Sequence, residues 1–226
     1  MTPILVLRPE PGASETMRRA RDAGLDATAA PLFAIEPLAW EAPDPTGFDA
    51  LLLTSANAVR EGGEQLKALR GLPVHAVGEA TAAAARDAGV AIASSGEAGV
   101  DRLLGAIAQE LRLLHLCGED RRPPAGARQT ITAIPVYRAR PIDRPELAAA
   151  AAGSIILLHS PRAGRRLGAL VDAAGANRAT IVIAAISAAA AQAAGAGWKA
   201  VETADQPSDA ALLALAARLC QKSAAT

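Results

Sequence analysis

The residues in this chain with the clearest chemical use are small, hydroxylated or basic residues that directly follow short apolar segments. Each segment is typical of a buried strand, and the residues after it are typical of a helix start, where free backbone N–H groups favour anions. A single serine there is better explained as a helix N-cap, but the set of junctions together favours an anion-binding site. The junctions are Leu7-Arg8, Thr54-Ser55, Val77-Gly78, Cys117-Gly118, His159-Ser160 and Ile186-Ser187.

Motifs of the common cofactor-binding and hydrolytic sites do not occur in the sequence. GxGxxG, GxxxxGKS/T, GxSxG, HExxH and the EF-hand loop are all missing. The histidines His75, His115 and His159 lie at or near apolar segments, and none has a second ligand at metal spacing. We therefore interpret all three as structural and predict neither a metal nor a cofactor.

The composition argues against nucleic-acid and membrane partners. Lys plus Arg and Asp plus Glu both number 23, so the formal net charge is zero, and the few aromatic residues offer no surface for base stacking. No run of about 18 apolar residues occurs, and the N-terminal MTPILVLRPEPG is typical of a first strand and not of a signal peptide. Cys117 and Cys220 are isolated, which suits a reduced compartment. We expect a cytoplasmic protein.

Apolar strands alternate with helices along most of the chain, which predicts α/β domains whose parallel sheets are covered on both faces. The expected strands cover residues 4–7, 49–53, 74–77, 90–93, 113–117, 154–158, 180–184 and 198–203, with extended segments at 25–38 and 131–139. The expected helices cover residues 14–23, 55–69, 79–88, 99–111, 161–174, 187–194 and 208–219, with Ser14 as the N-cap of the first.

An internal repeat indicates two related α/β domains. Residues 51–58, LLLTSANA, align with residues 156–163, ILLHSPRA, and both copies are followed by a second strand-to-helix junction. The C-terminal copy has too few strands for a sheet unless it includes the N-terminal strand and helix. The predicted organisation is a discontinuous domain of residues 1–36 plus 140–226, an inserted domain of residues 40–132, and two crossing segments at about 32–38 and 133–139.

At these residues the sequence resembles the uroporphyrinogen-III synthase family. The blocks that carry the resemblance, in the family's order and nearly from end to end, are VLRPEPGA, LLLTSANAV, VGEATAAAA, LLHLCGEDRR, VYRA, LLHSPRA and a late GW before the last helix. The resemblance implies two flavodoxin-like parallel-sheet domains joined by a two-stranded β-ladder, with an active-site cleft between them. It also implies a cyclising hydro-lyase of haem biosynthesis, which closes hydroxymethylbilane into uroporphyrinogen III with inversion of ring D, loss of water and no cofactor. With this resemblance we expect a monomer that acts on a small molecule with several carboxylates.

The resemblance assigns roles to particular residues. Tyr137, the only tyrosine, matches a cleft tyrosine of the family and is the candidate proton donor or water anchor, the alternative being a structural aromatic residue. Arg8, Arg138 and Arg162 would suit a substrate with several carboxylates. The candidate substrate-binding residues are Arg8, Thr54, Ser55, Asn57, Gly78, Thr81, Gly118, Ser160, Arg162 and Ser187.

The sequence departs from the family at two places and leaves two other interpretations open. Ala190 stands where many members have a threonine, and residues 123–129, PPAGARQ, stand where others have a helix. The same two-domain pattern also suits a non-catalytic bilobal module that binds a small anionic ligand. A degenerate synthase domain retained for interactions is the third interpretation.

Overall fold

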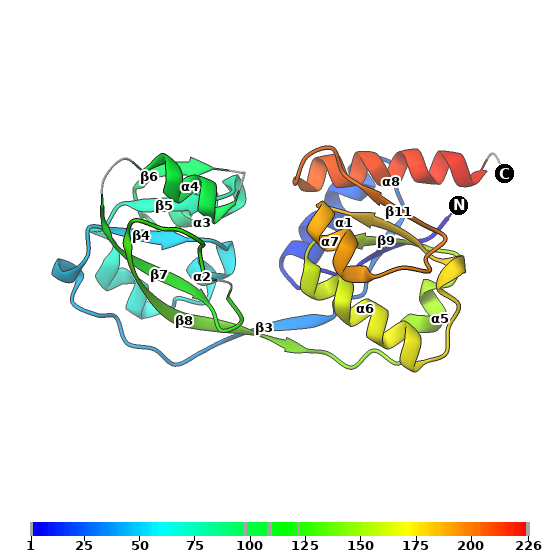
Figure 1. Ribbon diagram of the computed structural model, residues 1–226, viewed down its shortest axis with the longest axis horizontal. Helices are drawn as coiled ribbons and strands as arrows, with labels where there is room; N and C mark the ends of the chain where they lie inside the picture. Colours follow the sequence, from blue (N-terminus) through cyan, green and yellow to red (C-terminus); the bar gives the residue numbers. More distant parts are fainter. Residues whose placement is uncertain (1, 97–98, 108–109, 122, 225–226) are drawn as a thin grey trace. The chain divides into compact units, whose positions relative to one another are not determined.

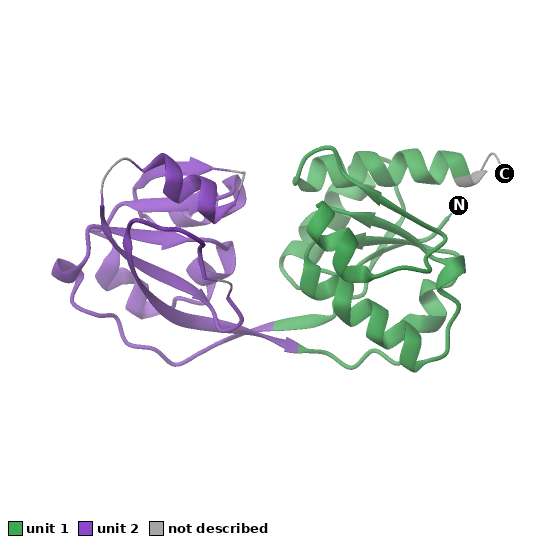
Figure 2. Ribbon diagram, viewed as in Figure 1, with its two compact units in different colours: residues 1–34, 141–226 green, residues 35–140 purple. Residues whose placement is uncertain are grey.

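The computed structural model describes residues 2–96, 99–107, 110–121 and 123–224. The chain forms two compact units: unit 1 contains Met1–Ala34 and Pro141–Thr226, and unit 2 contains Ile35–Arg140 (Figure 2). Unit 1 is therefore discontinuous in sequence, and unit 2 is inserted into it. In the part of the chain that the structure describes, no helix is long and apolar enough to cross a membrane.

Unit 1 contains a five-stranded parallel sheet in the order β11-β10-β9-β1-β2. β1, from the N-terminal segment, pairs with β9 near the middle of this sheet. Numbered along the chain, the order is that of a flavodoxin-like doubly wound sheet, and it reverses between β1 and β9. The strands are β1 (Ile4–Val6), β2 (Ala27–Ala29), β9 (Ile155–Leu158), β10 (Val182–Ala185) and β11 (Ala200–Thr203).

Helices cover both faces of the unit 1 sheet because its central strands are apolar on both sides. α1 (Gly12–Asp22) and α8 (Asp209–Ala224) pack on one face and share a core with β1, β9 and β10. The other face carries α5 (Leu147–Ala151), α6 (Pro161–Ala173) and α7 (Ala188–Ala194) (Figure 1). A short 3₁₀ helix, Arg178–Thr180, precedes β10.

Unit 2 contains a six-stranded sheet in the order β3-β8-β7-β4-β5-β6. The pairs from β8 to β6 are all parallel, and the chain order of these strands reverses between β4 and β7. Two α/β units whose sheets are mainly parallel are the fold class that the strand and helix alternation predicts, and it is confirmed. The strands are β3 (Phe33–Pro37), β4 (Ala50–Leu53), β5 (Val74–Val77), β6 (Ile92–Gly96), β7 (Arg112–Gly118) and β8 (Thr130–Pro141).

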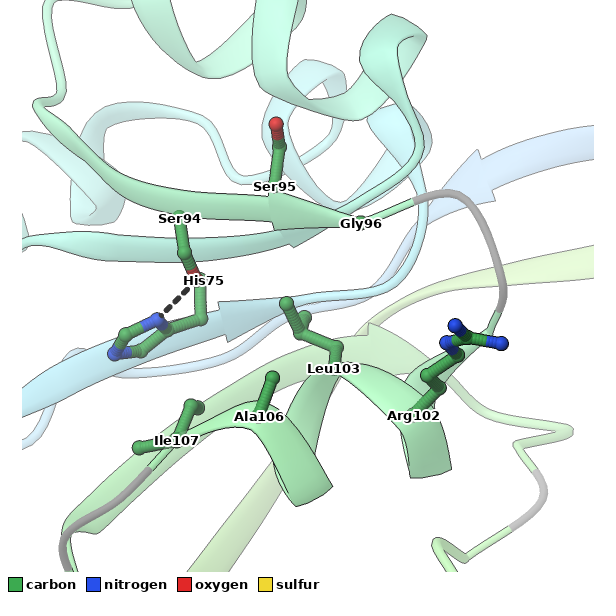
Figure 3. Close-up of a pocket in the computed structure, with 8 residues that line it drawn as sticks. All are labelled: His75, Ser94, Ser95, Gly96, Arg102, Leu103, Ala106 and Ile107. Atoms are coloured by element: carbon green, nitrogen blue, oxygen red, sulfur yellow. Dashed lines mark hydrogen bonds between the residues drawn. The ribbon is translucent and has the colours of Figure 1, made fainter.

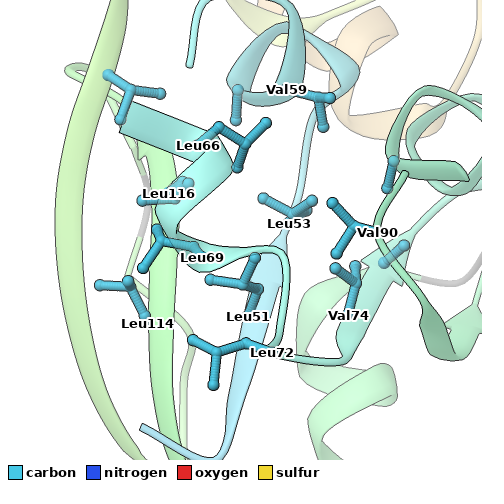
Figure 4. Close-up of a cluster of buried hydrophobic side chains, with 14 of the residues drawn as sticks. Leu51, Leu53, Val59, Leu66, Leu69, Leu72, Val74, Val90, Leu114 and Leu116 are labelled. Carbon is cyan, nitrogen blue, oxygen red and sulfur yellow. The ribbon is translucent and has the colours of Figure 1, made fainter. Parts of the chain in front are cut away.

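The alternating side chains of β4 show how unit 2 buries its sheet. Leu51 and Leu53 lie in a core beneath α2 (Ala56–Arg60), the 3₁₀ helix Glu64–Leu69 and α3 (Glu79–Asp87) (Figure 4). Ala50 and Leu52 face the opposite way and pack under α4 (Val100–Ala106). A 3₁₀ turn, Pro45–Gly47, leads into β4. The continuous apolar run ALLL is thus a strand buried on both faces.

The crossing segments form an antiparallel ladder of β3 and β8. The backbone N–H of Leu38 donates to the carbonyl of Val136 at 2.9 Å, and the N–H of Ile142 donates to the carbonyl of Leu32 at 3.0 Å. Residue numbers therefore rise along β3 while those of the hydrogen-bonded residues along β8 fall, which is the antiparallel pattern. β8 also pairs in parallel with β7, so the second crossing strand is an integral part of the unit 2 sheet.

The structure corrects the expected helix over residues 55–69. α2 ends at Arg60, and a separate 3₁₀ helix begins at Glu64. Gly63, the N-cap of this 3₁₀ helix, has φ +59°, a backbone conformation that a continuous α-helix cannot include.

Two other helix boundaries also differ from expectation. Ser14 is not an N-cap, because α1 already begins at Gly12 and the N–H of Ser14 donates to the carboxylate of Glu10 at 2.9 Å. The helix expected over 99–111 ends at Ala106, and residues 108–109 of that expectation lie outside the described residues. α5 has no counterpart among the expected helices, because LAAAA offers no start or stop signal of its own.

Candidate functional site

Each sheet has a topological switch point, where the chain order of the strands reverses. In open α/β sheets, ligands bind at the carboxyl ends of the strands at this point. In unit 1 the switch point lies between β1 and β9, which are followed by Arg8 and by Ser160. In unit 2 it lies between β4 and β7, which are followed by Thr54 and end at Gly118. Four of the predicted site residues, Arg8, Thr54, Gly118 and Ser160, therefore lie at positions where the topology favours a ligand.

At the switch point of unit 2, a buried histidine contacts a threonine. The Nε2 atom of His115, on β7, lies 3.1 Å from Oγ1 of Thr54, just after β4. His115 is only 2% exposed, and its Nδ1 atom has no hydrogen-bond partner among the described residues. Burial, with a smaller effect of the positive Arg121, lowers the pKa of His115 to about 4. The imidazole is therefore neutral at pH 7.

Tyr137 lies at the same edge, on the neighbouring strand β8. Burial raises the pKa of Tyr137, a hydrogen bond with Ser55 opposes this rise, and Cys117 adds to it. Its ring packs directly on Gly118, since a Cβ built there would lie 2.9 Å from Cζ and 3.1 Å from Oη. The phenol keeps its proton at neutral pH and is half-buried. It can therefore act as a hydrogen-bond or proton donor.

The three predicted serines all cap helices. The Oγ atoms of Ser55 and Ser160 accept the backbone N–H of Asn57 and Ala163, each at 3.2 Å. Ser187 accepts the N–H of Ala190 at 3.3 Å. The capping interpretation is confirmed for each serine. Capping uses the hydroxyl as an acceptor, so the O–H groups of Ser160 and Ser187 can still donate to a ligand, whereas Ser55 also bonds the phenol of Tyr137.

At the switch point of unit 1, charged groups meet at Asp209, in the first turn of α8. Oδ1 of Asp209 accepts from the hydroxyl of Thr16 at 2.8 Å and pairs with Nε2 of His159 at 2.9 Å. Oδ2 accepts from Arg19 at 2.8 Å. Burial alone would raise the pKa of Asp209, but the bonds from His159, Arg19 and Thr16 hold it well below its usual range. We call these groups, together with Arg8, the Asp209 cluster.

Arg8 belongs to the Asp209 cluster. Its Nη1 lies 3.7 Å from the Asp209 carboxylate and 3.3 Å from the Thr16 hydroxyl. Its guanidinium lies directly over Gly12, where a Cβ would come within 2.4 Å of Nε. Sequence reasoning missed Asp209, because an acidic residue in the first turn of a helix is ordinary. Only the fold brings it to Arg8.

The two other arginines singled out by sequence also have protein contacts. Arg162 lies over the ring of Phe33, 4.4 Å from its centroid. Arg138 pairs with Glu36 at 3.0 Å. Hydrogen bonds from Arg140 and Arg138 lower the pKa of Glu36.

Gly78, Thr81 and Ser187 lie one strand away from the switch points. Gly78 follows β5 with φ +84° at the start of α3, and Thr81 is 4% exposed on that helix. Ser187 follows β10. Ala190, where many members of the resembling family have threonine, is fully buried where α7 packs against Gly164.

A cavity of about 360 Å³ in unit 2 is separate from these residues (Figure 3). β5, β6 and α4 line it, and inside it Nδ1 of His75 lies 2.7 Å from Oγ of Ser94. None of the predicted site residues lines this cavity. Among the described residues, no group of three or more His, Cys, Asp or Glu side chains could hold a metal ion.

Comparisons with known proteins agree with this geometry. A family model described as "Uroporphyrinogen-III synthase HemD" matches residues 14–214. The fold is similar to that of uroporphyrinogen-III synthetase from Helicobacter pylori 26695, with a TM-score of 0.66 and 21% identity over 97% of this chain and 100% of that one. A mutant uroporphyrinogen III synthase from the extremely thermophilic bacterium Thermus thermophilus gives a TM-score of 0.57 and 18% identity over 98% of this chain and 100% of that one. A search of curated proteins found no match.

Proposed function

The chain belongs to the uroporphyrinogen-III synthase family, and from that membership we propose how its residues carry out the reaction. The family places it among cyclising lyases of tetrapyrrole biosynthesis that act on a small molecule. The substrate is hydroxymethylbilane, a linear tetrapyrrole. The product is uroporphyrinogen III, in which ring D is inverted. We further propose that the enzyme works as a cytoplasmic monomer without a cofactor.

The reaction requires a proton donor for the departing hydroxyl group and accurate positioning of the bilane. The terminal hydroxyl accepts a proton and leaves as water, and the remaining end of the chain becomes an azafulvene. The substituted carbon of ring D attacks this centre to form a spiro intermediate, which fragments and recloses, and the final loss of a proton balances the one taken up. Closure without inversion also occurs spontaneously, so the enzyme must hold the bilane in the conformation that leads to inversion.

Tyr137 is the proposed proton donor to the departing hydroxyl. The observation that carries this role is its place at the β4/β7 switch point, where the phenol contacts Ser55 and its ring packs on Gly118. Because burial raises the pKa of Tyr137, the phenol stays protonated at neutral pH. It therefore supports departure of the hydroxyl by donating a hydrogen bond as the C–O bond breaks.

The remaining residues are proposed to hold the substrate carboxylates. Carboxylates only accept hydrogen bonds, so the groups that bind them must be donors. Arginine forks, hydroxyls and backbone N–H groups at helix starts are all donors. The proposed set is Arg8, Ser160, Arg162 and Ser187 in unit 1 and Thr54, Ser55, Asn57, Gly78, Thr81 and Gly118 in unit 2.

The proposed activity is tested by supplying hydroxymethylbilane to the purified protein without added metal or cofactor. The product is oxidised, and the uroporphyrin isomers I and III are resolved by chromatography. Isomer III should predominate, whereas a control without enzyme should give isomer I. Isomer I alone, at the control rate, would instead support the non-catalytic anion-binding module.

A further inference from the structure

His115 is a buried group to which the proposed mechanism gives no part. It lies on the central strand β7, is 2% exposed, and contacts Thr54 through Nε2 at 3.1 Å. Its other ring nitrogen, Nδ1, is buried and without a hydrogen-bond partner among the described residues. Only Nε2 of this imidazole has a hydrogen-bond partner among the described residues. The neutral ring carries a single proton, which can be on either nitrogen.

The surroundings decide which nitrogen carries the proton. If Nδ1 carried it, a buried N–H donor would have no acceptor, which is a costly and rare arrangement. If Nε2 carries it, the N–H donates to Oγ1 of Thr54, and only a lone pair is left without a partner. Burial and the positive Arg121 both lower the pKa of His115, so the doubly protonated form does not compete at pH 7.

The tautomer of His115 decides whether the Thr54 hydroxyl accepts a hydrogen bond from the imidazole or donates one to it. When Thr54 Oγ1 accepts the N–H of His115, its own O–H is not needed by the imidazole. Thr54 is partly exposed, at the carboxyl end of β4 where the sheet order reverses. Its O–H therefore remains available to donate to a group outside the protein, and a carboxylate is the acceptor that the proposed substrate offers.

We propose that His115 is a positioning residue that makes the Thr54 hydroxyl a hydrogen-bond donor toward a substrate carboxylate. The inference rests on the proposed function, because Thr54 is one of the substrate-binding residues proposed above. The competing explanation is that His115 only fills space in the core of unit 2. If His115 is a positioning residue, its replacement should weaken substrate binding without lowering stability. If it only fills space, its replacement should lower stability without changing substrate binding.

The tautomer is measured first, by ¹⁵N NMR of the imidazole nitrogens in the substrate-free protein at pH 7. The His115 signals are identified as those that disappear in His115→Leu or, if that variant does not fold, in His115→Gln. A protonated Nε2 and an unprotonated Nδ1 are expected. A proton on Nδ1 would overturn the proposal, whatever the enzyme does with substrate.

Kinetics then separate positioning from packing. His115→Leu should raise KM roughly three- to tenfold with little change in kcat, the effect of one hydrogen bond. Its thermal stability should be equal or higher, because it replaces a partly unsatisfied buried polar ring with an apolar side chain. His115→Gln, whose amide N–H reaches a similar position, should recover most of the affinity. An unchanged KM in His115→Leu, whatever the stability of the variant, would show a packing role only.

A double-mutant cycle with Thr54→Val completes the test. Thr54→Val should raise KM about as much as His115→Leu, and the double variant should be no worse than either. Additive effects would show that His115 does not act through Thr54. If Thr54→Val leaves KM unchanged while isomer III still forms, the donor role of Thr54 is overturned but the proposed activity stands.

Discussion

The two switch points use different chemistry in the same place of a similar sheet. In unit 1, between β1 and β9, Arg8, Arg19 and His159 surround the carboxylate of Asp209. In unit 2, between β4 and β7, the contacts join neutral groups: His115 with Thr54, and Tyr137 with Ser55. Each unit also buries an imidazole that bonds through Nε2, namely His159 in unit 1 and His115 in unit 2.

The difference separates two physical tasks. A largely buried carboxylate that bonds two arginines, a histidine and a threonine ties helices and strands together, because removing it takes away the acceptor that these groups share. Neutral hydroxyls and a phenol cost less to bury and keep their protons, so they suit donation to a substrate. We therefore propose structural anchoring for Asp209 with His159, Thr16 and Arg19, and proton donation for the switch point of unit 2. The predictions below test this division, from the largest expected effect to the smallest.

Asp209→Ala should destabilise unit 1 by about 4 kcal/mol, because it leaves His159 and the nearby arginines without their shared partner. Unit 1 contains one of the two tryptophans, Trp198, so its unfolding can be followed by fluorescence in a Trp40→Phe background. The matched control is Asp22→Ala, which breaks the exposed pair with Arg18 and should cost under about 1 kcal/mol. Similar losses for the two variants would contradict an anchoring role for the cluster.

Unit 2 should lose about 3 kcal/mol through His115 alone as the pH falls from 7 to 4. The unfolded imidazole takes up a proton near pH 6.5, whereas the folded one, with its pKa lowered to about 4, does not, so acid favours the unfolded chain. The transition is followed through Trp40 in a Trp198→Phe background. His115→Leu should remove most of this pH dependence, leaving the part due to His75, whose pKa burial also lowers. A variant with the full wild-type slope would show that His115 is not buried as a neutral group.

Tyr137→Phe should slow turnover roughly ten- to a hundredfold while leaving the fold and substrate affinity intact. The lower part of the usual range for a positioned acid is expected, because water leaves readily from this substrate and neighbouring hydroxyls also donate. Single-turnover rates and the melting temperature of unit 2 are measured side by side. Unchanged turnover, or a large loss of thermal stability, would instead show that the phenol has a structural role in the β3/β8 ladder.

Gly118→Ala should reduce turnover by a few-fold, because its Cβ would meet Cζ of Tyr137 at 2.9 Å and shift the ring. Gly105→Ala is the control: nothing lies within 4 Å of its Cβ position, so activity should not change. The effect of Gly118→Ala should vanish when it is combined with Tyr137→Phe, as judged by kcat. A persisting effect would mean that the added methyl group does not act through Tyr137.

Part of the candidate site could be predicted from sequence because it depends on local rules. Ser55, Ser160 and Ser187 each stand at the end of an apolar run and before a helical pattern, which is where an N-cap is needed. Tyr137 is conspicuous as the only tyrosine. Local rules failed at Ser14, because a carboxylate outside the helix satisfies its N–H.

The partners of these residues could not be predicted in the same way. Asp209 is distant in sequence from Arg8, and nothing in the pattern of either segment points to the other. The contact of Thr54 with His115 exists because β4 and β7 are neighbours in the sheet, although β5 and β6 lie between them in the chain. Strand order is decided by which apolar faces pack together, and many orders are compatible with one hydrophobic pattern.

The sequence by itself therefore determined the elements of this protein: buried strands from apolar runs, helix starts from serine and glycine, and two related α/β halves from the repeat. These features depend on residues close together in the chain, whose conformational preferences and hydrogen bonds are local. Tertiary structure alone decided that Asp209 pairs with Arg8 and Arg19, that Gly118 packs against Tyr137, and that His115 contacts Thr54. Each of these contacts joins separate elements, so it exists only when the sheet has assembled in one particular strand order.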